Sequence, residues 1–578
     1  MNKFARKNFK IFFKSKGEPM LWLTGGGLVI SLLMIILLML LVLKNGLGNY
    51  WPEKIVYIKL KNGGSIMGEI TKTDYYKLPD DKLNGLNDED KKRLIENNGK
   101  EKRFLVRVGN FELSNKHFEW VSLHEISEQS YPAEAMVLER LEWGRFYGFP
   151  KEFLAEGKPI AKDLKGILEN YAKYHDEMRK LWRKKVSIEK GEIGKLNHKI
   201  EKERLKLKEA KFELDNARLS KDSKKINEAE ERYKKISLEF EEFNKLSKEE
   251  YERLIGQIDK LKSQYEKYGI KFLTADGKEK EVKLYEIVRG YTANTLNFGN
   301  KMGIYFSRWF EFLTDEPREA NSEGGVFPAI FGTVVMTVLM SLFVVPFGVV
   351  AAIYMKEYAK SGKMISILRI AINNLAGVPS IVYGVFGLGF FAYTLGATID
   401  QLFYSAKLPN PTFGTGGILW SSLTLALLTL PVVIVATEEA INAVPNSLRE
   451  GSYACGATKW QTVRYIVLPR AMPGIMTGFI LAMSRGAGEV APLMLVGAVK
   501  LAPEMPVDSI YPFVHLERSF MHLGFHIYDL GFQSQNSDAA IPMVYTTTLL
   551  LISIVILLNV VAIYIRNKLR KKFIGSVF

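Results

Sequence analysis

Residues 450–469 read EGSYACGATKWQTVRYIVLP. Glu450 stands where the start of a helix would favour an acid, and the small residues around Gly456 would let a surface helix approach a neighbour closely. Pro469 is expected to end this element before the next apolar stretch. From these residues alone, an ordinary helix-turn-helix lying on a membrane is the alternative interpretation.

The rest of the chain is divided between apolar and highly charged stretches. Its 578 residues include 79 Lys+Arg and 63 Asp+Glu, which gives a net charge of +16. Residues 28–43 are almost wholly apolar, whereas about half of residues 163–268 are Lys, Arg, Asp or Glu. One single globular core is therefore excluded, and a membrane part and a soluble part are predicted.

Cysteine and charge placement exclude further classes. The single cysteine, Cys455, cannot form an intrachain disulfide, and no Cys and His stand at metal-ligand spacing, so no disulfide scaffold and no metal site are predicted. The basic residues gather at the ends of apolar segments, where they act as topology signals. Nucleic-acid binding is therefore not expected.

Six apolar windows of about 20 residues are candidate transmembrane helices. The first has a basic segment before it, as a signal peptide has, but its apolar core is too long and lacks a small-residue cleavage site. An all-α polytopic membrane protein with an uncleaved first helix is predicted. The windows cover residues 20–43, 327–355, 367–396, 417–441, 474–499 and 544–565.

Basic residues at both chain ends predict the orientation. The segment 1–19 and the segment after the last window are rich in Lys and Arg, and such ends remain in the cytoplasm. Six crossings agree with two cytoplasmic termini in a multi-pass protein of the cell (inner or plasma) membrane. Residues 442–473 would then be a cytoplasmic loop, and residues 44–325 would lie outside the cytoplasm.

The outer segment has strand patterns on both sides of a helical section. Ile55, Tyr57 and Lys59 alternate before an Asn62-Gly63-Gly64 turn, which predicts a hairpin, and strand character returns after residue 270. We therefore predict a small β-rich extracytoplasmic module of residues 44–162 and 269–300. Residues 163–268 are inserted into it.

Apolar residues in the inserted section recur at spacings of three and four, as in a coiled coil. The break at 215–225 predicts an antiparallel coiled-coil hairpin, with arms of about 45 residues that would project about 65 Å. A solvated stalk and a docking arm for a partner or binding protein both remain open.

The segment 450–469 resembles the EAA loop of ABC importer permeases, whose pattern is Glu-Ala-Ala, three residues, Gly, nine residues, Ile, one residue, Leu-Pro. The spacing matches, although Gly451 and Ser452 replace the two alanines. The resemblance implies a short helix, a bend and a second helix that docks on an ATPase. The coupling residues that it implies are Glu450, Gly456, Ala457, Thr458, Ile466, Leu468 and Pro469.

Further segments resemble the PstA permeases of phosphate-specific ABC importers. The similarity is close over about 305–570 and does not cover about 50–300. It identifies residues 301–578 as a type I ABC permease core with five of the six helices. The matching segments are WFEFLT (309–314), GGVFPAIFGT (324–333), AAIYMKEY (351–358), NLAGVPSIVYG (374–384) and SRGAGEVAPL (484–493).

This resemblance implies the permease subunit of an ATP-driven phosphate importer that works by alternating access. It implies a PstC-like second permease, a PstB-like ATPase dimer and a PstS-like phosphate-binding protein as partners, in a lipid bilayer. ATP and Mg²⁺ belong to the ATPase, so the chain itself is expected to be no enzyme and to bind no cofactor. The chain also lacks the Gly-x-x-x-x-Gly-Lys-Ser/Thr pattern of a nucleotide site.

Arg485 and Glu489 are ionisable residues in an otherwise apolar window, and their spacing places them on one helix face. They could form a structural pair, or Arg485 could meet the phosphate oxyanion while Glu489 orients it. The family pattern Arg-x-x-Gly-Glu favours the second hypothesis. Ser380 and Tyr383 are further candidates for the pathway. Many PstA-like chains have a second arginine near the position of Val435, and this chain lacks it.

Two other functions remain as hypotheses. The chain could be a permease for another oxyanion, such as sulfate, molybdate or phosphonate, or a membrane-anchored sensor or scaffold that works through its coiled coil. Interrupted spans and an intramembrane Arg/Glu pair argue against a mere anchor. His515, His522 and His526, before the last window, could form a weak anion or metal cluster, but a surface position is expected for them.

Overall fold

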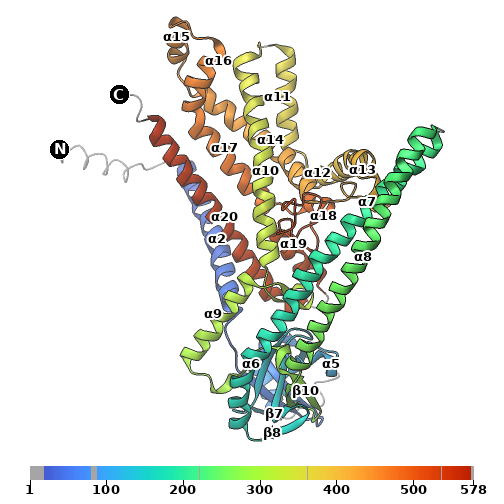
Figure 1. Ribbon diagram of the computed structural model, residues 1–578. Helices are drawn as coiled ribbons and strands as arrows, with labels where there is room; N and C mark the ends of the chain where they lie inside the picture. Colours follow the sequence, from blue (N-terminus) through green and yellow to red (C-terminus); the bar gives the residue numbers. More distant parts are fainter. Residues whose placement is uncertain (1–18, 80–87, 221, 361, 535–536, 575–578) are drawn as a thin grey trace.

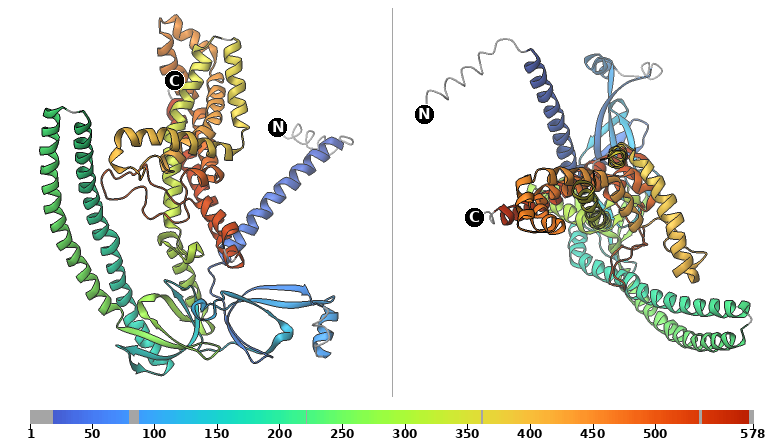
Figure 2. Two further views of the ribbon diagram at one scale, coloured as in Figure 1. Left: turned by 90° about the vertical axis from the view of Figure 1, so that its right-hand side faces the viewer. Right: turned by 90° about the horizontal axis from the view of Figure 1, so that it is seen from above.

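The computed structural model describes residues 19–79, 88–220, 222–360, 362–534 and 537–574. The basic segment 1–18 therefore lies outside the described residues. The molecule is elongated, with a bundle of apolar helices toward one end and the β-strands at the other (Figures 1 and 2). A long helical hairpin leaves the β-strands and runs back alongside the bundle.

Six helices in the described residues are long and apolar enough to cross a membrane, which confirms the predicted fold class. Few of the side chains on the first and last of them are buried, as expected for surfaces that face lipid. The six are α2 (Pro19–Gly48), α10 (Phe327–Ile353), α12 (Ser380–Phe386) continued by α13 (Ala397–Phe403), α14 (Ile418–Asn442), α16 (Lys459–Thr462) continued by α17 (Leu468–Gly488), and α20 (Ser537–Ile574).

Two of the predicted windows were placed wrongly. The window 367–396 contains a break: α11 (Lys363–Ala376) stops before Pro379, because the residue before a proline is pushed out of helical geometry, and the span begins at Ser380. The window 474–499 is interrupted after Gly488, and a short helix α18 (Ala491–Val496) follows. The fifth span instead begins at Lys459, inside the segment 442–473 that was predicted to be a cytoplasmic loop.

The β-rich part consists of two antiparallel sheets. The predicted hairpin is present, with Ile58 opposite Ile66 and Gly63 at φ +86° in its turn. The first sheet has the order β4-β3-β2-β1-β5, and the second β10-β9-β7-β6-β11 with β8 on β7. The strands are β1 (Ile55–Leu60), β2 (Ser65–Lys77), β3 (Lys100–Arg107), β4 (Phe118–Ser122), β5 (Ile126–Ser130), β6 (Met136–Arg140), β7 (Phe146–Ala155), β8 (Lys158–Ala161), β9 (Tyr268–Leu273), β10 (Glu279–Lys283) and β11 (Ile287–Thr292).

The helical hairpin is inserted between β8 and β9. It consists of α6 (Leu164–Ser187), a π-helical turn (Ile188–Ile193), α7 (Gly194–Ser220) and α8 (Ser223–Tyr265). Its base packs on the second sheet, where Ile167 and Leu254 join one apolar cluster with Phe153 and Phe272. The remaining elements are α4 (Asp88–Glu96), α5 (Phe111–Ser114), α9 (Phe298–Thr314), β12 (Pro317–Arg318), β13 (Glu323–Gly324), α15 (Asn446–Ala454) and α19 (Leu523–Tyr528).

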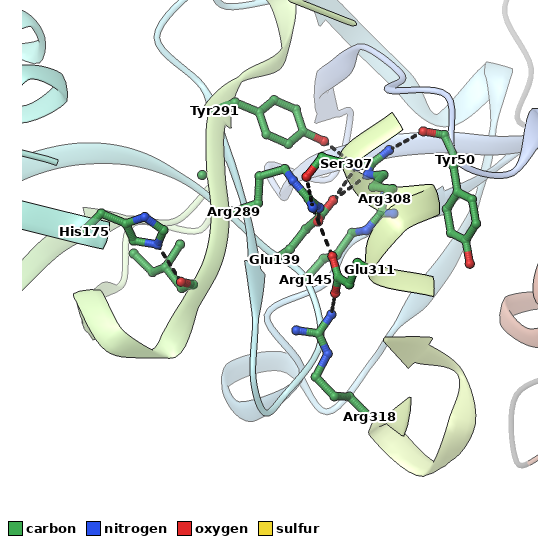
Figure 3. A network of polar contacts seen from close by, with 12 residues as sticks. Tyr50, Glu139, Arg145, His175, Arg289, Tyr291, Ser307, Arg308, Glu311 and Arg318 are labelled. Carbon is green, nitrogen blue, oxygen red and sulfur yellow. Dashed lines mark hydrogen bonds and ion pairs between the residues drawn. The ribbon is translucent and has the colours of Figure 1, made fainter. Parts of the chain in front are cut away.

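A buried network of charges attaches the β-rich part to the helices (Figure 3). Arg308 of α9 donates from Nε to Glu139 Oε1 of β6 at 2.8 Å, from Nη2 to the Tyr291 hydroxyl at 2.6 Å and from Nη1 to the Tyr50 carbonyl oxygen at 2.9 Å. Arg289 of β11 pairs with the other oxygen of Glu139. Tyr50 lies two residues after the end of α2, so Arg308 joins the segment that follows α2 to α9 and to Glu139 of β6.

The network continues through α9 to the small β12-β13 hairpin. Arg289 also donates to Glu311 Oε2 at 3.0 Å, and Arg318 pairs with the same carboxylate. Burial alone would raise the pKa of the Glu139 carboxyl, but the guanidinium groups of Arg308 and Arg289 outweigh it and hold this pKa below its usual range. The Glu139 carboxyl is therefore ionised at neutral pH.

Replacing Glu139 by Gln should weaken this junction. Glu139→Gln leaves the guanidinium groups of Arg308 and Arg289 buried with a neutral partner, and we expect a loss of about 3–5 kcal/mol from the free energy of opening of β6 and β11. Amide hydrogen exchange of these strands measures that quantity.

Glu128→Gln is the matched control, because Glu128 pairs with Lys59 at 2.7 Å while both side chains are more than half exposed. We expect it to cost much less than Glu139→Gln, because solvent screens an exposed pair. Equal losses in the two variants would show that the buried network does not hold the junction.

Candidate functional site

The segment 446–469 forms two short helices joined at a glycine, at the end of the molecule opposite the β-strands (Figure 1). Gly456 has φ +80°, in the left-handed region that favours glycine, and lies just after α15. Ala457 follows, and the Thr458 hydroxyl caps α16 by accepting a hydrogen bond from the Gln461 backbone N–H at 3.3 Å. Glu450 is not at a helix start as predicted, but lies exposed in the middle of α15, which begins at Asn446.

Pro469 does not end the element, contrary to the prediction. It lies in the first turn of α17, directly after the π-helical turn Val463–Val467, where the α-helical hydrogen-bond ladder is already interrupted. Helical residues therefore run without a gap from Lys459 to Gly488. At 1.5 Å per residue, about 40 Å of continuous helix separates Thr458 from Arg485.

Ile466 and Leu468 are only half-buried. The residues of this segment that lie in the core are Val463 and Val467, which pack with Ile353 at the end of α10. The sequence pattern did not single these valines out, although their spacing of four residues places them on one helix face. It also missed Arg449, which connects α15 to the ends of α10 and α14.

Arg485 and Glu489 meet at the break in the fifth span. Arg485 lies in the last turn of α17, where the helix dipole favours a cation, and Glu489 is the first residue after the helix. Arg485 Nε lies 3.5 Å from Glu489 Oε1. The Arg485 side chain is 35% exposed and that of Glu489 is 21% exposed, so the pair is accessible from outside the chain.

Tyr383 is the third predicted pathway residue that lies at this break. Its hydroxyl donates to the Leu375 carbonyl oxygen at 2.6 Å and interacts electrostatically with the Arg485 guanidinium group. Its neighbour Gly384 packs on α18, where an added Cβ would lie 2.8 Å from the Pro492 Cα. Ser380 begins α12, and none of the hydrogen bonds of the described residues joins it to Arg485.

The three histidines are buried, which contradicts their predicted surface position. His515 Nε2 lies 3.1 Å from Asp508 Oδ1. Burial lowers the pKa of His522 to about 3 and that of His526 to about 4, so both rings are neutral at physiological pH. Across the described ranges, no group of three His, Cys, Asp or Glu residues is arranged to hold a metal ion.

Comparison with known proteins identifies the family. Residues 344–574 match the family described as binding-protein-dependent transport system inner membrane component. The probable ABC transporter permease protein YqgI of Bacillus subtilis is 30% identical, over 46% of this chain and 86% of that protein. The chain belongs to the ABC transporter permeases.

Two further relatives match the permease over shorter segments. The probable ABC transporter permease protein YqgH of Bacillus subtilis is 38% identical, over 34% of this chain and 62% of that protein. The phosphate transport system permease protein PstA 1 of Mycobacterium tuberculosis is 41% identical, over 30% of this chain and 52% of that protein. The match thus spans less than two thirds of the length of these two relatives.

Membership of this family settles what the permease does not do by itself. In such transporters the ATPase is a separate subunit, and the permease subunits form the membrane part and bind no cofactor. The chain is therefore the permease component, and in such transporters ATP belongs to the separate ATPase subunit.

The bend at Gly456 can be tested against a second glycine of the same loop. Gly456→Ala should destabilise the loop by about 1–2 kcal/mol, because a side chain is strained in the left-handed region. Gly451→Ala, inside α15, should stabilise it by about 0.5–1 kcal/mol. Neither added Cβ would meet an atom within 4 Å, so the comparison isolates backbone strain.

Hydrogen exchange of residues 446–469 in the purified permease measures both effects. Opposite signs are expected. A loop that is unchanged or stabilised in Gly456→Ala would show that the bend does not depend on the glycine.

Proposed function

We propose that this permease carries inorganic phosphate across the cell membrane as part of an ATP-driven importer that works by alternating access. The observation that carries the proposal is the Arg485-Glu489 pair, which lies at a helix break and is joined to the loop 446–469 by one continuous helix. The similarity to a relative named as a phosphate transport system permease supports the choice of substrate.

Arg485 has the chemistry that a phosphate oxyanion requires. Its guanidinium group presents five N–H donors in a planar fork that matches two oxygens of an anion. Among the described residues, its one hydrogen bond is the 3.5 Å contact from Nε to Glu489, so both terminal nitrogens remain for an anion. Between turnovers, the Glu489 carboxylate would pair with the Arg485 guanidinium group. It would also repel a bound anion, which favours release.

The loop 446–469 is the proposed contact with the ATPase, through the exposed Glu450 and the bend at Gly456. A displacement of this loop by ATP-driven closure would pass along α16 and α17 to Arg485. The complete importer would then contain a PstC-like permease, a PstB-like ATPase dimer and a PstS-like binding protein.

The arrangement of the elements also supports an orientation. The loop 446–469 and the basic end of α20 lie at the end of the molecule opposite the two β-sheets (Figure 1). We place the loop and the C-terminal end in the cytoplasm because positively charged ends stay there. The β-rich part, and the hairpin that it carries, then lie outside the cytoplasm.

The hairpin is proposed as a docking arm for the binding protein. Lys208 of α7 donates to the Leu408 carbonyl oxygen at 2.7 Å, and Lys190 pairs with Glu316, so the arm is held against the outer loops. Cavities of about 950 and 600 Å³ lie between this arm and the loop 501–519. These cavities provide concave surface beside the proposed entrance to the pathway.

Uptake of radiolabelled phosphate into proteoliposomes tests the substrate and the site. We expect Arg485→Ala to lower ATP-dependent uptake by the complete complex at least about tenfold, because a charge-assisted hydrogen bond to the anion is lost. Arg470→Ala, at an exposed arginine on the same helix, should leave uptake unchanged.

Sulfate and molybdate serve as competitors in the same assay. Uptake of one of these anions instead of phosphate would show a permease for another oxyanion. Full phosphate uptake by Arg485→Ala would reduce the Arg485-Glu489 pair to a structural role.

Shortening the arm tests its role in docking. Deletion of residues 204–241, with a Gly/Ser turn joining the two helices, removes the distal hairpin, in which Arg232 pairs with Glu213 across the arms. We expect the concentration of binding protein needed for half-maximal uptake to rise about fivefold or more. The base of the hairpin should remain folded on the second sheet, and an unchanged concentration would favour a solvated stalk.

A further inference from the structure

The Arg449 side chain makes five hydrogen bonds within the chain. Its Nε and Nη2 donate to Glu357 Oε1 at 3.2 and 3.1 Å, and Nη2 also donates to the Ile441 carbonyl oxygen at 2.8 Å. Its Nη1 donates to the Val444 carbonyl oxygen at 2.6 Å and to Asn446 Oδ1 at 3.1 Å. These contacts match the five N–H donors of a guanidinium group.

Apart from Asn446, which begins α15, the acceptors lie at or just beyond the ends of two membrane helices. Glu357 lies in the π-helical turn Tyr354–Tyr358 that ends α10, and Ile441 and Val444 lie at the end of α14, where helix carbonyls lack helical donors. The side chains of Arg449 and Glu357 are only 12% and 8% exposed. Low local polarity strengthens such an ion pair and makes an unpaired partner costly.

Further contacts join α15 to α16, and both helices to the ends of α10 and α14. The hydroxyl groups of Ser452 in α15 and Thr462 in α16 lie 2.9 Å apart. Lys459 of α16 lies over the Tyr358 ring, 5.3 Å from its centre. Leu448 of α15 packs on the apolar cluster that the ends of α10, α14 and α16 share.

We propose that the Arg449-Glu357 pair is the joint that makes α15 move as one body with the ends of α10 and α14. This inference rests on the proposed contact between the loop 446–469 and the ATPase. Arg449 is thus a positioning residue, which touches no substrate and acts through the helices that it joins. When the joint is broken, the ATPase displaces α15 while α10 stays behind, and ATP is hydrolysed without uptake.

Two substitutions break the joint in different ways. Arg449→Lys keeps the positive charge but has three donors on one nitrogen, which cannot reach Glu357 and both carbonyl oxygens together. Glu357→Gln keeps the shape and removes the negative charge. Arg369→Lys is the matched control, because Arg369 pairs with Glu438 at 3.3 Å at the same end of the molecule, while its side chain is half exposed.

Distances between spin labels measure the joint directly. One label is placed on the native Cys455, which is exposed at the end of α15, and the other on Lys356→Cys, at the end of α10. In the complex with the second permease and the ATPase, in lipid nanodiscs, we expect ATP to leave this distance unchanged in the intact chain and in Arg369→Lys. In Arg449→Lys and Glu357→Gln, ATP should change it.

A second label pair, Cys455 with Lys568→Cys at the end of α20, shows whether ATP moves α15 at all. Its distance should change with ATP in every variant. A constant distance here would overturn the proposed coupling, and the joint with it. If ATP changes this second distance but leaves the first distance unchanged in Arg449→Lys, the joint alone would be overturned.

Transport gives an independent readout. We expect the amount of substrate taken up per ATP hydrolysed to fall at least about fivefold in Arg449→Lys, the lower end of typical coupling between sites. A merely structural role would lower uptake and ATP hydrolysis together and leave their ratio unchanged, which would refute the joint.

Discussion

Backbone N–H and C=O groups in a bilayer must find partners within the protein, and this constraint gives meaning to the two helix breaks of the permease. The break before Pro379 frees carbonyl groups at the end of α11, and the Tyr383 hydroxyl satisfies that of Leu375. The break after Gly488 is covered by α12, since Gly384 packs on Pro492. The same requirement thus brings Tyr383, Arg485 and Glu489 to one place.

Buried ion pairs lie at both ends of the elongated molecule. At one end, buried carboxylates of Glu139 and Glu311 fix the β-sheets to α9, and at the other Glu357 and Arg449 fix α15 to α10. Between these ends the helices touch through small residues, such as Gly478 against Ala436 and Gly474 against Ala440. Smooth helix surfaces without charged contacts allow small sliding movements, as a gate requires.

Much of the fold could be predicted from the sequence because its signals are local. Hydropathy located six spans, and heptad spacing with a break at 215–225 predicted the helical hairpin. Asn62-Gly63-Gly64 predicted the turn of the β1-β2 hairpin. The errors in the third and fifth windows both come from averaging hydropathy along the chain. The average does not register the proline that stops the helix in the third window, or the polar residues into which the fifth helix continues.

The candidate site was less accessible to prediction. The resemblance to the EAA loop implied the bend at Gly456, but the partner of Arg449 lies 92 positions away in the chain and no local pattern connects the two. The histidines were misplaced for a similar reason. The loop that carries them packs on α10, where the Leu523 backbone N–H donates to the Thr333 hydroxyl, and only tertiary structure shows this contact.

The place where the helical hairpin enters the β-sheet has an evolutionary consequence. Ala161 and Ile270, at its two ends, both pair with Phe153 of β7, from opposite sides. Two strand spacings separate them, about 10 Å, which is also the usual distance between the axes of packed helices. A coiled coil of any length therefore fits between β8 and β9 without disturbing the sheet, so related chains can lengthen, shorten or exchange this arm in a single genetic event.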